Sequence, residues 1–422
     1  MIFDAVVLGA GPSGCAAATA LARAGRSVLL VDRDPEPRFK IGESLLPWNL
    51  PLFEELGLME KIEAAGFQRK FGALFTNEAT GGTRQVIFRQ AWNGDHPSAF
   101  QVKRKEFDGL LADHARASGA EVRRGLKAEE AIFEGDRAVG VRLSGPAGSE
   151  EIRAKVVLDA TGQAALLASR LKLRRQDTNL RKAAFYAHFE GVFRGEGERG
   201  GDILLPFLPD VWFWAIPFSD GSASVGAVFE PRVLETLSGR THEERFEELL
   251  RRSVTMRAYL ASARRVTGVS AVSDYSFTSE RHGGDGWALV GDAATFLDPV
   301  FSTGVFLGMS AGIRAAKAVD AALRAKGRVD AADFTAYGRT TRRMVGRFRP
   351  FVYGYYDPVF TRMFCEKAPV DALRAAVTSV LAGDVEEPAL AVRFFNRMTL
   401  FLFALARRFE RPPEPAPLAS TV

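Results

Sequence analysis

A glycine-rich turn near the N-terminus constrains the fold of this chain more than any other feature. A short, mostly apolar run, Phe3 to Leu8, leads directly into a GxGxxG sequence at residues 9–14. Apolar runs without alternation are typical of strands that are covered on both faces, as in a parallel sheet. An alanine-rich helix is expected over 15–24, and a second apolar strand over 27–32. This order predicts a doubly wound α/β domain that binds a dinucleotide.

The residues of this turn have distinct physical roles in such a site. Gly9 permits the tight turn, Gly11 lets the backbone approach a pyrophosphate, and Gly14 lets the helix pack close to the strand. The helix N-terminus, near Ser13, attracts the phosphate charge. Asp32, at the end of the second strand, is placed to accept hydrogen bonds from a ribose. The alternative is a glycine turn that binds no ligand.

Two later strand ends and one arginine indicate which dinucleotide is bound. One expected strand ends in an Asp-Ala-Thr-Gly turn, another ends in a Gly-Asp pair, and the arginine precedes a helix. These motifs resemble the FAD-dependent aromatic hydroxylase superfamily over residues 1 to about 325. The resemblance implies FAD contacts at Arg104, Thr161, Gly162 and Asp292, to which we add Arg33 beside Asp32. The alternative for Thr161 and Asp292 is a role as turn residues at strand ends.

The source of reducing equivalents is also constrained by the sequence. No second GxGxxG follows a strand elsewhere, so an obvious nicotinamide domain is lacking. We therefore expect a separate flavin reductase to supply reduced FAD, or a nicotinamide to bind only transiently.

Four further segments narrow the resemblance to the flavin-dependent halogenases. They are KIGESLLP at 40–47, AAGFQRKFGA at 64–73, WFWAIP at 212–217 and FLDPVFSTG at 296–304. The WxWxIP and FxxPxxSxG patterns of that family are both complete. Lys70 stands where the phenol and pyrrole halogenases carry their catalytic lysine, so the resemblance implies that it receives hypohalous acid. It would do so by hydrogen bonding or as a haloamine, and burial in a dry tunnel would lower its pKa.

The same resemblance implies roles for the neighbouring residues. FAD, in its reduced form, would use oxygen and chloride or bromide, and the amides that open a helix expected over 305–325 form a natural anion site. The implied halide residues are Ser302, Thr303 and Gly304. Residues implied to lie against the flavin are Glu43, Ser44, Pro299 and Gly304. Residues implied to separate flavin from substrate are Trp212, Trp214, Ile216 and Phe301.

Each of these residues also has a purely structural interpretation. Lys70 could be a solvated surface lysine, as most lysines are. Trp212 and Trp214 share one face of a strand, and paired tryptophans there can simply pack in a core. Glu43 and Ser44 could cap the helix that follows them.

Phe301 restricts the substrate class. Tryptophan halogenases carry a glutamate at this place, so no carboxylate is available here to position hypohalous acid or to act as a base. The resemblance therefore points to the phenol and pyrrole branch, in which the electron-rich ring supplies its own activation. The substrate would be a free aromatic molecule or one tethered to an acyl-carrier-type protein.

Three rival functions remain open from sequence alone. An FAD-dependent reductase or desaturase resembling the geranylgeranyl reductases would fit the apolar C-terminal helices. However, Ile216 and Phe218 replace an aromatic residue and a lysine of that family's motif. An FAD aromatic monooxygenase would not need Lys70 or the two tryptophans. A flavin-binding module without activity is the fourth possibility.

The expected fold is an FAD-binding domain of the Rossmann-like, glutathione-reductase type with an inserted antiparallel sheet. The FAD-binding domain is expected at 1–66, 101–175 and 265–330, and the substrate-binding sheet domain at 67–100 and 176–264. A helical cap follows at 331–411, with a flexible proline-rich tail at 412–422. Alternating runs such as 222–229 and 184–193 predict antiparallel strands with one covered face.

Composition excludes several classes of function. Two cysteines and five scattered histidines cannot build a metal site of the common kind, so no metal is expected. A net charge of +5 is too small and too dispersed for nucleic-acid binding. No signal peptide is apparent and the apolar run at 398–406 is too short to cross a bilayer, so a cytoplasmic enzyme is expected. The arginine- and aromatic-rich segment 339–365 could pack as a cap, cover an apolar substrate or dock an acidic carrier; membrane-surface contact is less favoured.

Overall fold

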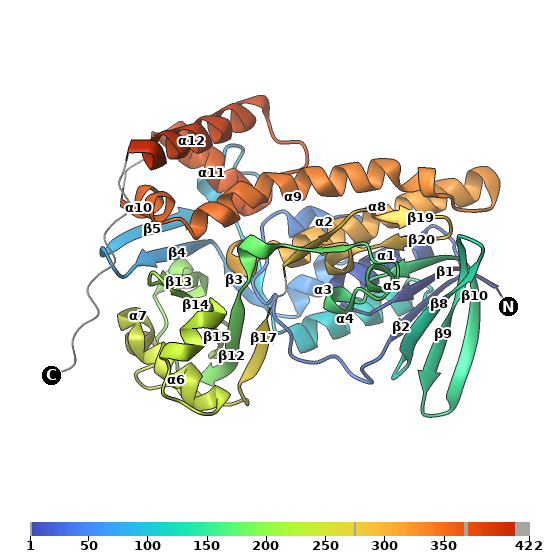
Figure 1. Cartoon of the computed structure of the whole chain (residues 1–422), viewed down its shortest axis with the longest axis horizontal. Helices are drawn as coiled ribbons and strands as arrows, with labels where there is room; N and C mark the ends of the chain where they lie inside the picture. The colour runs from blue at the N-terminus through green and yellow to red at the C-terminus, as the bar shows by residue number, and fades with distance from the viewer. Residues whose placement is uncertain (1, 274–275, 367–369, 410–422) are drawn as a thin grey trace.

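The computed structural model describes residues 2–273, 276–366 and 370–409, and two large sheets dominate it (Figure 1). The first sheet has the strand order β19-β20-β10-β1-β2-β7, and β1 pairs in parallel with both β10 and β2. Its strands are β1 (Ile2–Leu8), β2 (Val28–Asp32), β7 (Glu121–Arg124), β10 (Gly148–Asp159), β19 (Gly283–Gly284) and β20 (Trp287–Leu289), with the antiparallel pair β8 (Lys127–Glu134) and β9 (Arg137–Gly145) attached to β10. The expected doubly wound α/β fold is confirmed, and its topological switch point lies between β1 and β10.

Helices cover the first sheet. They are α1 (Pro12–Arg23), α4 (Arg104–Ala117) and α8 (Gly304–Lys326), with the shorter α2 (Asn49–Leu56), α3 (Met59–Ala64) and α5 (Leu166–Arg170) nearby. The helix expected from residue 15 begins at Pro12, because proline has no N–H to lose in the first helical turn. Close packing of α1 on α8 depends on a glycine. A Cβ at Gly312 would lie 2.3 Å from the Ser13 carbonyl oxygen.

The second sheet has the order β16-β12-β15-β14-β13-β4-β5, with β17 also paired to β12. Its strands are β4 (Gly72–Asn77), β5 (Gly82–Ile87), β12 (Ala183–Glu190), β13 (Ile203–Phe207), β14 (Val211–Pro217), β15 (Ser222–Phe229), β16 (Arg264–Arg265) and β17 (Ser270–Ser273). Most neighbours are antiparallel, but β13 and β4 are parallel. Because residues 264–273 pair with β12, the boundary expected at 265 falls too early. Small two- and three-stranded sheets join β3 (Gln68–Lys70) to β6 (Ala99–Gln101), and β11 (Arg174–Gln176) and β21 (Thr295–Phe296) to β18 (Phe277–Ser279).

One expectation about this sheet is wrong. Residues 222–229 do form an antiparallel strand, but every residue of β15 is buried, so both of its faces are covered. Helix α6 (His242–Arg252) packs on one face beside α7 (Val254–Tyr259), with Phe246 and Leu249 in the same apolar cluster as Val225. The other face turns toward the cavity described below. Small residues in β15 allow this double coverage, which alternation alone did not reveal.

Four helices complete the described chain: α9 (Thr335–Tyr355), α10 (Pro358–Glu366), α11 (Asp371–Ala382) and α12 (Leu390–Phe409). In Figure 1, α10 to α12 gather beside β4 and β5, away from the first sheet. In α12 only Val392 is buried, and large apolar side chains such as Phe394 and Phe401 are exposed. No helix among the described residues is long and apolar enough to span a membrane. The tail expected at 412–422 lies outside the described residues.

The contact between α1 and α8 generates a test of the fold. Replacement of Gly312 by alanine should lower the free energy of unfolding by about 1–3 kcal/mol, because the methyl group meets backbone atoms of α1 that cannot move aside. Gly346 in α9 is the matched control, since a Cβ there meets nothing within 4 Å. Its replacement by alanine should raise stability by up to about 1 kcal/mol through helix propensity. Equal denaturant midpoints for the two variants would contradict the packing argument.

Candidate functional site

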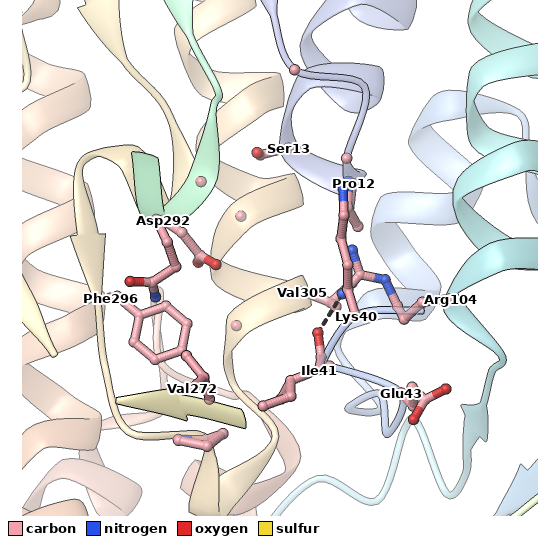
Figure 2. A pocket seen from close by; sticks show the side chains of 18 of the residues that line it. Pro12, Ser13, Lys40, Ile41, Glu43, Arg104, Val272, Asp292, Phe296 and Val305 are labelled. Atoms are coloured by element: carbon pink, nitrogen blue, oxygen red, sulfur yellow. Dashed lines mark hydrogen bonds between the residues drawn. The ribbon is translucent and has the colours of Figure 1, made fainter. Parts of the chain in front are cut away.

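A cavity of about 500 Å³ lies at the carboxyl ends of β1 and β10, at the switch point of the first sheet. Its lining comes from the glycine-rich turn, the loop at 38–44, the turn at 160–164, the start of α8 and the inner face of the second sheet. Figure 2 shows Arg104 and Asp292 on opposite sides of it. The cavity thus collects segments that are far apart in the sequence.

The glycines around the cavity divide into two kinds. A Cβ at Gly9 would lie 2.4 Å from the Ala160 carbonyl oxygen, and one at Gly14 would lie 1.9 Å from the Gly9 oxygen, so these two positions need glycine for close packing. Cβ atoms at Gly11, Gly162 and Gly304 would meet no protein atom within 4 Å, although all three residues line the cavity. Their backbones therefore border open space, as a phosphate or flavin contact requires.

Polar groups in the lining also fit an elongated polar ligand. The Gln163 amide nitrogen is buried without a hydrogen-bond partner in the described chain. One Asp32 carboxylate oxygen accepts the Ala10 N–H at 2.7 Å, and the other accepts the Asp34 N–H at 2.9 Å. The carboxylate is thereby fixed at the cavity wall. The spare acceptor capacity of its oxygens suits a ribose hydroxyl.

Three other residues predicted to bind the cofactor also line the cavity, but one of their side chains already has a hydrogen-bond partner within the protein. Ser13 and Arg33 both line the cavity, and the Arg33 side chain is largely exposed beside Asp34. Thr161 also lines it, but its hydroxyl donates to the buried Asp159 carboxylate at 2.6 Å. Through this hydrogen bond the Thr161 hydroxyl holds the turn in shape.

The buried Arg104 and the half-buried Asp292 form polar walls of the cavity. Arg104 is held by Asp108, one helical turn later, through two hydrogen bonds of 2.9 Å, and it donates to the Ile41 carbonyl oxygen at 2.6 Å (Figure 2). Burial raises the pKa of Asp292 to about 7, although the Arg104 charge opposes the shift. A hydroxyl group of a ligand that donates to this carboxylate would offset its loss of hydration.

Sequence analysis missed the partner of Glu43. His188, on β12, places Nε2 3.0 Å from Glu43 Oε1, and its ring lies 4.0 Å from that of Phe39. Glu43 is buried and lines the cavity. A lone histidine in an alternating strand carried no signal of this pairing, which arises only where the second sheet meets the 38–44 loop.

Lys70 lies behind Ser44 as seen from the cavity. Its Nζ donates to Ser44 Oγ at 2.8 Å and to the Leu45 carbonyl oxygen at 3.1 Å, and it sits 5.3 Å from the centre of the Phe88 ring. The side chain is only 2% exposed, so the interpretation of Lys70 as a solvated surface residue is wrong. Burial lowers its pKa to about 7, with a smaller opposing effect from Asp202.

The tryptophans of β14 line the cavity together with Ile216. Trp214 Nε1 donates to Ser224 Oγ at 3.1 Å, and Trp212 Nε1 donates to Tyr356 Oη at 2.8 Å. Tyr356 in turn donates to Asp298 at 2.7 Å. The pair is therefore both cavity wall and packed core, and it reaches the C-terminal helices.

The turn before α8 brings only part of the predicted halide set to the cavity. Ser302, with φ +58°, lines the cavity together with Pro299 and Gly304. Thr303 is buried behind this wall. Phe301 also lies off the cavity, and its ring packs against Phe75 and Tyr355, which are 6.1 and 5.9 Å away. Phe301 thus lies between the cavity wall and the C-terminal helices.

Comparison with known proteins agrees with this geometry. The family described as FAD binding domain matches residues 3–347. The 1H-pyrrole-2-carbonyl-(peptidyl-carrier protein) chlorinase of Pseudomonas fluorescens is 31% identical over 405 residues, covering 91% of this chain and 89% of that protein. The corresponding brominase of Pseudoalteromonas luteoviolacea is 32% identical, covering 76% and 78%. The solved structure of the myxobacterial chondrochloren halogenase CndH superposes with a TM-score of 0.78 at 30% identity, covering 95% and 97%. These relatives favour the halogenase interpretation of the motifs over the reductase and hydroxylase alternatives.

The open space at Gly11 provides a test of the cofactor site. Replacement by valine should weaken FAD binding by about 100-fold or more, because the side chain occupies the space that a pyrophosphate needs. Stability of the FAD-free protein should change little, since no protein atom is displaced. Flavin fluorescence titration with a parallel thermal melt measures both, and Gly346→Val is the control. A Gly11→Val variant that is purified with full flavin content would refute the contact.

Proposed function

Because this chain belongs to the flavin-dependent halogenases of the FAD-binding-domain family, we propose that it transfers chlorine or bromine to an electron-rich aromatic ring, a phenol or a pyrrole. Lys70 carries the proposal. It is a fully buried ammonium, separated from the cofactor cavity by one serine, with a pKa lowered toward neutrality. An aromatic hydroxylase has no need of such a group.

FAD fits the cavity on the geometry of this chain. Gly11 and Gly162 offer bare backbone, and Gln163 offers a donor without a partner in the described chain. Arg104 offers a fixed charge, and Asp292 offers an acceptor. Bound reduced FAD supplies the electrons with which oxygen and halide give hypohalous acid. We assign the halide to the amides at the start of α8, beside Ser302 and Gly304, where the helix dipole favours an anion.

The remaining site residues would keep hypohalous acid from escaping to solvent. Trp212, Trp214 and Ile216 form an apolar wall on the side of the second sheet. Each tryptophan is anchored through its indole N–H, so the wall is fixed in place. Ser44 lines the cavity on the side of the 38–44 loop, with Lys70 hydrogen-bonded behind it. Hypohalous acid would therefore be directed toward Ser44 and Lys70 instead of leaking to solvent.

The experiment that tests this function uses the full chain with FAD, an unrelated flavin reductase, a nicotinamide and oxygen. Chloride or bromide is added with simple phenols and pyrroles, free or loaded on a carrier protein. Halogenated products are detected by mass spectrometry. Hydroxylated products independent of halide would favour the monooxygenase alternative, and reduction of an alkene would favour the reductase alternative.

Two protein partners follow from the proposal. A separate reductase would deliver reduced FAD, since the chain shows one dinucleotide motif. The pyrrole relatives act on carrier-bound rings, as their names state, and an acidic carrier protein would suit α12. That helix contains no acidic residue, and Arg393 and Arg397 lie among exposed apolar side chains such as Phe394 and Phe401.

Loss of Lys70 should separate flavin chemistry from halogenation. In Lys70→Ala, halogenated product should fall by about 100-fold or more, while FAD binding and oxygen consumption persist. Lys61, an exposed lysine on α3, is the control, and Lys61→Ala should keep full product yield. Product is quantified by mass spectrometry and oxygen by electrode. Unchanged product in Lys70→Ala would remove this residue from the mechanism.

Charge reversal on α12 tests the carrier partner. The double variant Arg393→Glu/Arg397→Glu should weaken binding of a ring-loaded carrier protein by about tenfold at low salt, and raised salt should shrink the difference. Halogenation of a free aromatic should not change. Arg251→Glu on α6 is the control, because that arginine is also exposed but belongs to a different surface. Equal carrier affinity for all three proteins would leave α12 without this role.

A further inference from the structure

The position of Ser44 differs from that of a simple flavin contact. Ser44 lines the cavity, whereas Lys70 is not among the lining residues in the described part of the chain. The two side chains are joined by the 2.8 Å hydrogen bond between Nζ and Oγ, and Ser44 is only 3% exposed. A reagent formed in the cavity therefore meets the Ser44 hydroxyl before it meets the lysine.

The direction of this hydrogen bond determines where the serine proton points. A lysine ammonium is a donor only, so Ser44 Oγ must accept from it. The hydroxyl hydrogen of Ser44 is then directed away from Lys70, and Ser44 is a residue that lines the cavity. The Leu45 carbonyl oxygen accepts a second Nζ proton, which fixes the ammonium behind the serine.

We propose that Ser44 is the residue that contacts hypohalous acid, and that Lys70 acts through the Ser44 hydroxyl as the proton source behind it. The proposal rests on the halogenase function given above. In this proposal Lys70 is a general acid that acts through Ser44. It is not a nucleophile that binds the halogen covalently.

The step balances without a further reagent. The C–X bond to the ring forms as the O–X bond of hypohalous acid breaks, and its electron pair goes to the oxygen. That oxygen takes the Ser44 proton and leaves as water, and Ser44 takes a proton from the Lys70 ammonium. The halogenated ring then loses its own proton to solvent, and Lys70 is reprotonated.

The surroundings of Lys70 suit this role. Its lowered pKa places proton release near the working pH, as efficient general acids require. Among charged groups, Asp202 favours the ammonium form. The Glu43–His188 pair adjoins Ser44, and Arg104 and Asp292 face the same cavity. Because burial raises the pKa of Asp292 to about 7, a pH profile must be paired with a direct titration of Lys70.

Acid and nucleophile roles predict opposite pH dependence. An acid needs the ammonium, so halogenation under saturating FAD should fall as pH rises through the Lys70 pKa. A haloamine route needs the free amine, so halogenation would rise over the same range. A rise that tracks the titration of Lys70 Nζ would overturn the proposal.

Variants of Ser44 provide the decisive experiment. The full chain is labelled with ¹⁵N-lysine, and the Lys70 Nζ resonance is identified by its loss in Lys70→Ala. In Ser44→Ala the Lys70 pKa should fall, because the ammonium loses an acceptor. Product should fall by about 100-fold while hypohalous acid trapped in solution by monochlorodimedone rises. Ser44→Thr should restore the Lys70 pKa, the product and the trapped hypohalous acid toward their wild-type values. Ser98→Ala, which removes a buried hydroxyl bonded to Arg69 beside Lys70, should change none of the three.

Two results would distinguish failure of the Ser44 proposal from failure of the halogenase function. If Ser44→Ala only weakens FAD binding, with product recovered at saturating FAD and the Lys70 pKa unmoved, Ser44 is a flavin contact and the proposal is overturned. If the wild-type protein gives neither product nor trapped hypohalous acid, the halogenase function fails and takes this role with it. If the Lys70 pKa still falls in Ser44→Ala, the hydrogen bond between Lys70 and Ser44 exists although the halogenase function does not.

Discussion

The close contact between α1 and α8 sets the geometry on which the rest of the site depends. Gly14 packs on the Gly9 carbonyl oxygen, and Gly312 packs on that of Ser13, so the backbones of the first strand and both helices touch without side chains between them. This contact carries the start of α8 to the cavity that Gly11 borders. The glycine-rich turn and the turn before α8, about 290 residues later, consequently line one cavity.

The burial of a lysine is the second constraint, and it acts against stability. An ammonium without water is costly unless it is hydrogen-bonded, and here two acceptors and the field of Asp202 offset that cost only in part. Asp202 is itself fixed, because it accepts the Phe71 N–H at 2.9 Å and the Gln85 amide at 2.8 Å. A lowered pKa at Lys70 is the consequence of this arrangement. Such a group is typical of sites in which a proton is moved.

The C-terminal helices contact the cavity wall from behind. Tyr356, just beyond α9, accepts from Trp212 and donates to Asp298, which joins a strand of the second sheet to the loop before α8. The ring of Tyr355 packs on Phe301 and Trp212. A movement of these helices would therefore be felt at the apolar wall of the cavity. This provides a physical route by which a docked partner could influence the flavin side.

Sequence alone determined what depends on short-range pattern. The strand–GxGxxG–helix–strand order predicted the parallel sheet, because glycines at those spacings between two short apolar runs suit few other folds. Motifs at strand ends indicated the cofactor for a similar reason: the carboxyl ends of parallel strands converge. The segment at 64–73 resembles that of the halogenases and identified Lys70 as a candidate catalytic residue. Its burial could not be predicted, because its neighbours include polar residues such as Arg69.

Only the tertiary structure decided which groups touch. The Lys70–Ser44 bond spans 26 residues, and the Glu43–His188 pair spans 145, so neither leaves a periodic signal in the sequence. The sequence also did not reveal that both faces of β15 are covered. Its small residues gave an alternating pattern, although the side chains on both faces are buried. Local pattern records the backbone conformation and the side on which a residue lies. Contacts between distant segments depend on how the sheets and helices pack, and that packing determines the burial, the shifted pKa and the chemistry of the site.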